Sequence, residues 1–326
     1  MANDVPKAHF ELFTDEEKAR EFFEKHRWPE GPVCPHCGEV NNAYKLAGKT
    51  TRKGLYKCAG CRNKFTVTMR SIFEDSHIPL HKWFFAVHLM CASKKGMSAF
   101  QFHRMTETFY GKKVSYHTAW FMFHRIRYAM TQHPMIEKLR GTVEADETWV
   151  GPKEKGTGFR GTGHPQSKKR PVLALLDRER GKVRSFPMER ATLENIKPIM
   201  KAHVEVGTTI QSDEANVYHF MRDEFPNHDV VTHKNKEYSR REPDGRLVTT
   251  NTVEGYFSLI KRGIYGTYHH VGVPYLQQYL NEFDFRYNNR KVTDAERASV
   301  ALKATEGKRL TLRTPLAGLT VRRDVQ

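Results

Sequence analysis

Four of the five cysteines stand in two short pairs with the spacing of a metal site. Cys34 and Cys37 form the first pair, Cys58 and Cys61 form the second, and twenty residues separate the pairs. Zn²⁺ prefers four ligands in a tetrahedron, and each Cys-x2-Cys turn can present two thiolates about 2.3 Å from one ion. Four thiolates leave no open position, so the pattern predicts one structural zinc per chain.

Other interpretations of the cysteines are weaker. Unrelated buried cysteines are not expected to fall in two matched pairs, and a redox function needs only one dithiol. His36 lies inside the first pair and could compete as a ligand, although four thiolates already complete the shell. Cys91 stands alone in an apolar segment, which is typical of a small core residue.

Three carboxylates are candidates for a second metal centre because of the elements in which they fall. Asp146 lies in a predicted strand at 142–150, Asp213 closes a predicted strand at 208–213, and Glu254 lies on a predicted helix. Mg²⁺ prefers a few carboxylates, with water and substrate phosphate completing its octahedron. Two such ions roughly 3.5–4 Å apart can activate an attacking oxygen and stabilise the leaving one. We therefore expect two catalytic Mg²⁺ or Mn²⁺ ions here.

The helix that carries Glu254 begins near Thr250 and has two distinct faces. At about 100° per residue, its apolar face is formed by Val253, Phe257 and Ile260. The neighbouring polar face carries Asn251, Glu254, Ser258 and Lys261. If the apolar face packs on the sheet, the polar face lies over the strand ends, close to both aspartates.

Neighbouring acidic residues are weaker candidates for this centre, and motifs of two other enzyme classes are missing. Glu147 and Glu214 adjoin the two aspartates, and a neighbour in a strand points to the opposite face, so they rank second. The chain contains no His-Glu-x-x-His and no Gly-x4-Gly-Lys-Ser/Thr. These absences argue against a zinc peptidase and against a P-loop ATPase.

The charge of the chain favours a nucleic acid partner. Lysine and arginine total 54 against 37 acidic residues, which leaves a net charge of +17. Residues 1–33 carry 5 basic and 8 acidic side chains, whereas residues 76–140 carry 10 and 2. Such an excess points to a polyanion. An acidic centre inside a basic protein suits phosphodiester chemistry, because the basic surface holds DNA while metal ions neutralise the scissile phosphate.

The hydropathy pattern argues against a membrane protein. The longest mainly apolar run, at residues 83–92, is about half the length of a membrane span. The first residues lack the apolar core of a signal peptide. We expect a cytoplasmic, nucleoid-associated protein without a membrane partner.

The elements that must position these residues change in type along the chain. A capping box at Thr14–Glu17 opens a first helix, short strands and turns surround the cysteines, and helical periodicity follows. From residue 141 strands alternate with helices, and the glycine-rich, basic stretch 151–170 is predicted to be a mobile loop. The predicted multi-domain order is an N-terminal helix (1–33), a zinc ribbon (34–75), a helical DNA-binding segment (76–138), an α/β catalytic domain (139–295) and a basic C-terminal tail (296–326).

The helical segment has the pattern of a helix-turn-helix, with residues 115–127 as the helix that enters a DNA groove. Its predicted exposed side carries Lys112, Lys113, His117, His124, Arg125 and Arg127. The alternative is a plain helical linker whose charges are merely solvated. The neighbouring zinc ribbon favours the DNA-contacting interpretation.

Several sequence blocks occur together in one order. The catalytic part contains Glu144-Ala145-Asp146-Glu147-Thr148, Ser212-Asp213-Glu214 and Asn251-Thr252-Val253-Glu254-Gly255. Further blocks lie at residues 27–29, 65–67, 95–99, 118–120, 125–127, 261–263, 266–269 and 282–288. Over about residues 10–290 the chain resembles the DDE-type transposases of bacterial insertion sequences, in the subgroup with an N-terminal zinc ribbon.

The resemblance implies a fold and a reaction. It implies an RNase H-like catalytic domain with Asp146 and Asp213 as metal ligands, and Mg²⁺-dependent cleavage at transposon ends. Water attacks first, and the freed 3′-hydroxyl then attacks target DNA. The third ligand stays open between Asn251 and Glu254. Lys261, with Arg262 beside it, matches the basic residue that such enzymes place near DNA.

The expected partners are double-stranded DNA, as transposon ends and as target, and further copies of the chain on that DNA. Two other functions were considered. One is a catalytically silent DNA-binding regulator derived from a transposase, against which the intact Asp146, Asp213 and Glu254 argue. The other is a recombinase with a tyrosine or serine nucleophile, which trapping of a covalent DNA adduct would reveal.

Overall fold

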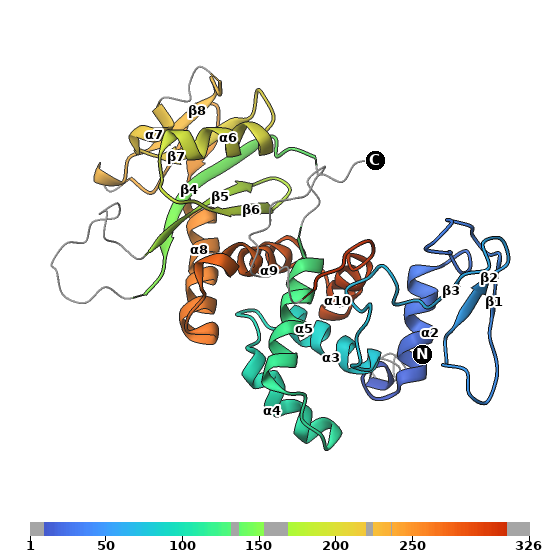
Figure 1. The fold of residues 1–326 in the computed structure, drawn as a ribbon. Coiled ribbons are helices and arrows are strands. Elements are labelled where there is room, and N and C mark those ends of the chain that lie inside the picture. The colour runs from blue at the N-terminus through green and yellow to red at the C-terminus, as the bar shows by residue number, and fades with distance from the viewer. Residues whose placement is uncertain (1–9, 132–136, 153–168, 220–223, 236, 312–326) are drawn as a thin grey trace, which may run out of the picture. The chain divides into compact units, whose positions relative to one another are not determined.

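A computed structural model describes residues 10–131, 137–152, 169–219, 224–235 and 237–311 (Figure 1). The chain forms two compact units. The first combines Met1–Ser93, Met97–Met130 and Val292–Gln326, and the second combines Lys94–Gly96 with Thr131–Lys291. In the part of the chain that the structure describes, no helix has the length and apolar character needed to cross a bilayer.

The first unit is mainly helical and contains one small antiparallel sheet. The sheet has the order β1 (Ala43–Lys45), β2 (Tyr56–Cys58) and β3 (Lys64–Phe65). The helices are α2 (Glu16–Arg27), α3 (Leu80–Ala92), α4 (Ala99–Tyr110), α5 (Tyr116–Ala129) and α10 (Asp294–Lys303). The cap of α2 is Asp15 rather than Thr14, because Asp15 Oδ1 accepts the N–H groups of Glu17 and Lys18 at 2.8 and 3.1 Å.

Aromatic side chains join α2 to the small sheet and to α3. Trp28, at the end of α2, packs edge-on against Tyr56 and Phe65 of the sheet, with ring centroids 5.6 and 5.7 Å away. Phe23 packs edge-on against Phe84 of α3 at 5.9 Å. Such contacts bury large apolar surfaces and fix the relative orientation of the elements that carry them.

The residues that follow 291 return to the first unit. Where the sequence predicted the start of a basic tail at residue 296, the chain forms α10, which packs on α3. Arg297 of α10 donates to the carbonyl oxygen of Cys91 at 2.9 Å, and Lys308 donates to that of Ala129 at 2.7 Å. One face of α10 is apolar although the predicted tail is basic overall, because Ala298, Ala301 and Leu302 are buried. The rest of the predicted tail, 312–326, lies outside the described residues.

The second unit is built on a five-stranded mixed sheet. Its order is β6 (Lys182–Pro187), β5 (Arg170–Asp177), β4 (Thr142–Val150), β7 (Thr209–Asp213) and β8 (His228–Val231). β4 and β6 are antiparallel to β5, whereas β7 runs parallel to β4 and β8 parallel to β7. This is the RNase H-like α/β fold that the sequence predicted.

Helices cover both faces of the sheet (Figure 1). α6 (Leu193–His203) and the short α7 (Asn216–His219) lie on one face, where Ile196 and Met200 of α6 pack with Val143 and Leu173. α8 (Asn251–Gly263) and α9 (Leu276–Asn288) lie on the other. Because strand residues alternate, Val143 and Ala145 face α6, whereas Glu144 and Asp146 face α8.

Two features of this unit were not predicted. A hairpin of β9 (Ser239–Arg241) and β10 (Leu247–Thr249) stands between β8 and α8, and a π-helical turn at Ile264–Tyr268 extends α8. Short 3₁₀ turns occupy His233–Asn235 and Val273–Tyr275. The predicted mobile loop at 151–170 lies, from 153 to 168, outside the described residues.

Candidate functional site

The four cysteine sulfurs of the ribbon converge on one point. Their Sγ atoms all lie within 4.8 Å of one another, with 3.6 Å between Cys34 and Cys61 and between Cys37 and Cys58. Zinc bonded tetrahedrally to four thiolates at about 2.3 Å requires sulfur–sulfur separations of roughly 3.8 Å. The cluster therefore has the size of a zinc site, as the cysteine spacing predicted.

The surroundings of the cluster support a bound cation. The N–H of Glu39 lowers the pKa of Cys37, yet desolvation and the three other thiols raise it to about 12. Four thiolates cannot coexist so closely without positive charge between them, and zinc supplies that charge. His36 is not a fifth candidate, because its Nε2 lies 3.3 Å from the Lys64 carbonyl oxygen. Cys91 is a buried core residue, as predicted.

Strand register brings the two aspartates of the second unit together. β4 pairs in parallel with β7 through Val143–Ile210 and Glu144–Gln211. Two residues further along, the same register sets Asp146 beside Asp213, where the ladder has ended and the side chains are free to converge. Both belong to the sheet face that α8 covers, and each carboxylate accepts a nearby backbone N–H, Glu147 at 2.7 Å and Ala215 at 3.0 Å.

Helix α8 presents the faces that its periodicity predicted. Val253, Phe257 and Ile260 are buried against the sheet, whereas Asn251, Ser258 and Lys261 are exposed and Glu254 is partly exposed. Glu254 Oε1 accepts the Thr250 hydroxyl at 3.1 Å and lies 3.4 Å from Nε2 of His233. His233 was not predicted, because it comes from the 3₁₀ turn after β8, and no spacing in the sequence connects it to α8.

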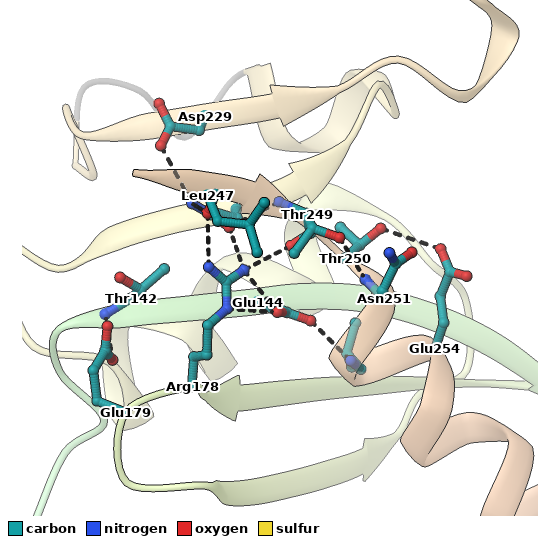
Figure 2. A network of polar contacts seen from close by, with 12 residues as sticks. Thr142, Glu144, Arg178, Glu179, Asp229, Leu247, Thr249, Thr250, Asn251 and Glu254 are labelled. Atoms are coloured by element: carbon teal, nitrogen blue, oxygen red, sulfur yellow. Dashed lines mark hydrogen bonds and ion pairs between the residues drawn. The ribbon is translucent and has the colours of Figure 1, made fainter. Parts of the chain in front are cut away.

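Glu144 fixes the position of α8 on the sheet (Figure 2). It is fully buried, and its Oε2 accepts the N–H of Val253 in the first turn of α8 at 2.8 Å. Thr250, the residue at the helix cap, makes no side-chain cap hydrogen bond. A carboxylate from β4 thus satisfies a first-turn N–H that would otherwise lack a partner, and its charge suits the positive end of the helix dipole.

Arg178 balances this buried carboxylate and extends the network (Figure 2). Its Nε and Nη2 donate to Glu144 Oε1 at 2.9 and 2.7 Å. The same guanidinium donates to the carbonyl oxygens of Leu247 and Thr249 in β10 at 2.7 and 2.9 Å. Sheet, hairpin and α8 therefore meet at one ion pair. Neither residue could be given a role from the sequence.

The carboxylates of Asp213, Glu147 and Glu254 lie close enough to Asp146 for their charges to act on it. Burial raises the pKa of Asp146 to about 8, and the charges of Asp213, Glu147 and Glu254 contribute to the rise. Burial also raises the pKa of Glu147 to about 7. Glu147 points toward Tyr218 on the opposite face, in agreement with strand alternation.

Asp146, Asp213 and Glu254 suit a divalent cation because of the type of their ligand atoms, and they do not surround a preformed site. Their oxygens are the hard donors that Mg²⁺ and Mn²⁺ prefer, and a bound cation would stabilise the charged form of Asp146, whose pKa is raised by burial and, to a lesser extent, by repulsion. Among the described residues, the four cysteines are the one group of three or more whose ligand atoms lie within 4.8 Å of each other. The oxygens of Asp146, Asp213 and Glu254 do not form such a group, so ions held there would need water or phosphate as further ligands.

Comparison with known proteins agrees with this geometry. The family model of the ISXO2-like transposase domain matches residues 138–288, and that of the transposase zinc-ribbon domain matches residues 14–64. The chain belongs to the DDE-type transposases of insertion sequences that carry an N-terminal zinc ribbon. It is also 26% identical, over 293 residues, to an uncharacterised protein in transposable element ISH50 of Halobacterium salinarum, covering 84% of this chain and 91% of that protein.

The predicted DNA-binding residues of this transposase divide into two groups. Lys112 and Lys113, before α5, and Lys261 and Arg262, on α8, are exposed as expected. The prediction that His124, Arg125 and Arg127 are exposed is wrong, because all three are buried in the second half of α5. Arg125 donates to the Glu74 carbonyl oxygen at 2.6 Å, and its guanidinium lies 5.6 Å from the Trp83 ring. These side chains stabilise the first unit and do not face DNA.

The zinc ribbon yields a first prediction. Purified wild-type protein is expected to contain about one zinc per chain by elemental analysis, and Cys58→Ser to lose it, because three thiolates hold the ion far less well than four. The ribbon should then become sensitive to proteolysis. Cys91→Ser, outside the cluster, is the matched control and should keep the zinc. A metal-free protein with an intact ribbon would contradict the assignment.

The ion pair beneath α8 yields a second prediction. Arg178→Met leaves Glu144 buried without its cation and should lower the free energy of unfolding by about 3–5 kcal/mol. Arg246→Met removes an exposed pair with Asp229 and should cost no more than about 1 kcal/mol. Urea denaturation measures both. Equal losses in the two variants would show that the buried pair is not what holds this region together.

Proposed function

We propose that this protein cuts the ends of its insertion sequence and joins the freed 3′-hydroxyls to target DNA at Asp146, Asp213 and Glu254. The observation that carries the proposal is the placement of three carboxylates on β4, β7 and α8, where burial raises the pKa of Asp146 to about 8 and the charges of Asp213 and Glu254 add to the rise. Folding maintains this unfavourable charge cluster in a chain of net charge +17. Such strain is typical of a site built for a ligand of opposite charge.

When bound, two divalent cations would activate the attacking oxygen and stabilise the leaving one. Asp146 and Asp213 stand on adjacent strands, so their separation is set by the sheet and not by loops. Glu254 is held from two directions by Thr250 and His233. The same arrangement serves both reactions, first with water and then with the 3′-hydroxyl as nucleophile, and neither needs a covalent protein–DNA intermediate.

Glu254, rather than Asn251, is the proposed third ligand. Two cations bring +4 to a pair of aspartates, so a third negative charge is electrostatically useful, whereas an amide offers only a neutral carbonyl. Asn251 is more exposed and lies beside Glu254 on the same helix face, where it would serve as a hydrogen-bonding neighbour. Lys261 and Arg262, about two turns further on, would hold DNA phosphates.

The ribbon and the helical segment of the first unit would recognise the transposon ends, and several copies of the chain would assemble on the DNA, in the cytoplasm at the nucleoid. A catalytically silent regulator is the competing function. It would share the DNA binding and lack the cleavage, so one assay separates the two.

Cleavage of a transposon-end duplex in Mg²⁺ or Mn²⁺ tests the proposal. Asp146→Asn and Asp213→Asn should abolish cleavage and leave DNA binding intact, because each removes a ligand charge without changing side-chain size. Glu254→Gln should lose most activity and Asn251→Ala less. Glu205→Gln, an exposed carboxylate elsewhere in the second unit, is the matched control. Normal cleavage by Glu254→Gln with an inactive Asn251→Ala would make Asn251 the third ligand, and wild-type protein that binds ends without cutting them would indicate a regulator.

Salt dependence of DNA binding gives a further prediction. Each phosphate contact adds about 0.9 to the negative slope of log affinity against log salt concentration on B-DNA. Six or more contacts by the basic surface should therefore give a slope of roughly −5 or steeper, measured by fluorescence anisotropy over a salt titration. Binding indifferent to salt would mean that the net charge of +17 is not used for DNA.

A further inference from the structure

Helix α5 changes character along its length. Ser115, Tyr116 and His117, at its start, are exposed, whereas residues 122–127 are all buried. A helix that is surrounded by protein cannot enter a DNA groove, so only the first turn of α5 is free to do so. This matches the way a recognition helix reads DNA, with its N-terminal residues at the base edges.

Large aromatic rings are exposed beside this first turn. Phe100 of α4 is 57% exposed and Tyr116 is 45% exposed, with their ring centroids 6.4 Å apart. The Arg104 guanidinium lies 5.8 Å from the Phe100 ring and is itself exposed. Exposed aromatic residues that gather in one place, with a cation among them, mark a binding surface rather than a poorly packed core.

The support beneath these residues is rigid. Ser98 and Ser115 cap α4 and α5 through hydrogen bonds to Gln101 N and Thr118 N, both at 3.1 Å. In the turn between the helices, buried Val114 donates its N–H to the Thr106 hydroxyl at 3.0 Å. Its carbonyl oxygen lies 2.6 Å from Nδ1 of His103. The two helices therefore present the aromatic pair in one fixed arrangement.

The charge around the pair identifies the occupant. Arg104, Lys112 and Lys113 are exposed here, and the nearby carboxylate, Glu107, is paired with Lys113 at 3.0 Å. A second protein copy with the same basic surface would be repelled, whereas the phosphates of a DNA duplex are complementary.

We propose that the α4–α5 front, defined as Phe100, Gln101, Arg104, Lys112, Tyr116 and His117, reads the base sequence of the transposon end in the major groove. Tyr116 and His117 meet base edges, and Phe100 makes the apolar contact that a thymine methyl group offers. Arg104 and Lys112 contact the flanking phosphates and set the register. This inference rests on the proposed function only in taking the transposon end as the cognate DNA.

The experiment compares the affinity of the full-length protein for two duplexes, the inverted repeat that brackets the gene and a shuffled sequence of equal length. Tyr116→Ala and Phe100→Ala should each reduce the affinity ratio by about tenfold and leave binding to the shuffled duplex unchanged. Arg104→Ala should weaken both complexes equally and reduce the salt slope by about 1. Val206→Ala, which shortens an exposed apolar residue of the second unit, should change neither quantity.

Several outcomes would overturn the inference. One is an unchanged affinity ratio in Tyr116→Ala and Phe100→Ala when both variants show wild-type thermal unfolding. Another is a change in oligomeric state, measured by light scattering, without a change in the affinity ratio, which would make the front a contact between copies. If the wild-type protein cleaves the ends and both variants keep the wild-type affinity ratio between the inverted repeat and the shuffled duplex, only this inference is overturned. Wild-type protein that neither cleaves nor distinguishes the ends overturns the proposed function as well.

Discussion

The buried ion pair of Glu144 and Arg178 is the constraint on which the catalytic unit depends. A fully buried carboxylate destabilises the fold unless it is paired with a cation and hydrogen-bonded. Glu144 is fully buried and meets both conditions through Arg178 and the N–H of Val253. The pair does more than satisfy its own charges. It fixes the start of α8 against β4, and Glu254 lies one residue beyond the N–H that Glu144 accepts.

The same pair explains how one strand can carry two carboxylates with different duties. Glu144 and Asp146 share the face of β4 that α8 covers, two residues apart. Arg178 and the first turn of α8 neutralise the charge of Glu144, so Glu144 is not available to bind a cation. Among the described residues no basic side chain pairs with Asp146, whose pKa is raised to about 8 by burial first and then by the charges of Asp213, Glu147 and Glu254. The charge available for a cation is thus concentrated at the ends of the strands.

Much of this arrangement could be predicted from sequence because it rests on periodicity. Alternation in β4 and the 100° step of α8 placed Asp146 and Glu254 on facing surfaces, and the structure confirms both patterns. The contribution of Arg178 could not be predicted, since its partners come from three separate elements and lie 33 to 71 positions from Arg178 along the chain. The predicted exposure of Arg125 and Arg127 is wrong, because the prediction assumed that basic side chains on an amphipathic helix face solvent.

The burial of those two arginines also bears on how the first unit is organised. An arginine can be buried when its guanidinium finds carbonyl oxygens and aromatic faces, as Arg125 does with Glu74 and Trp83. The second half of α5 is thereby committed to the core, together with α3 and α10. At the start of α5, by contrast, Ser115, Tyr116 and His117 stay exposed. The net positive charge counted along the sequence therefore overstates the charge at the surface of this segment, because Arg125 and Arg127 are buried.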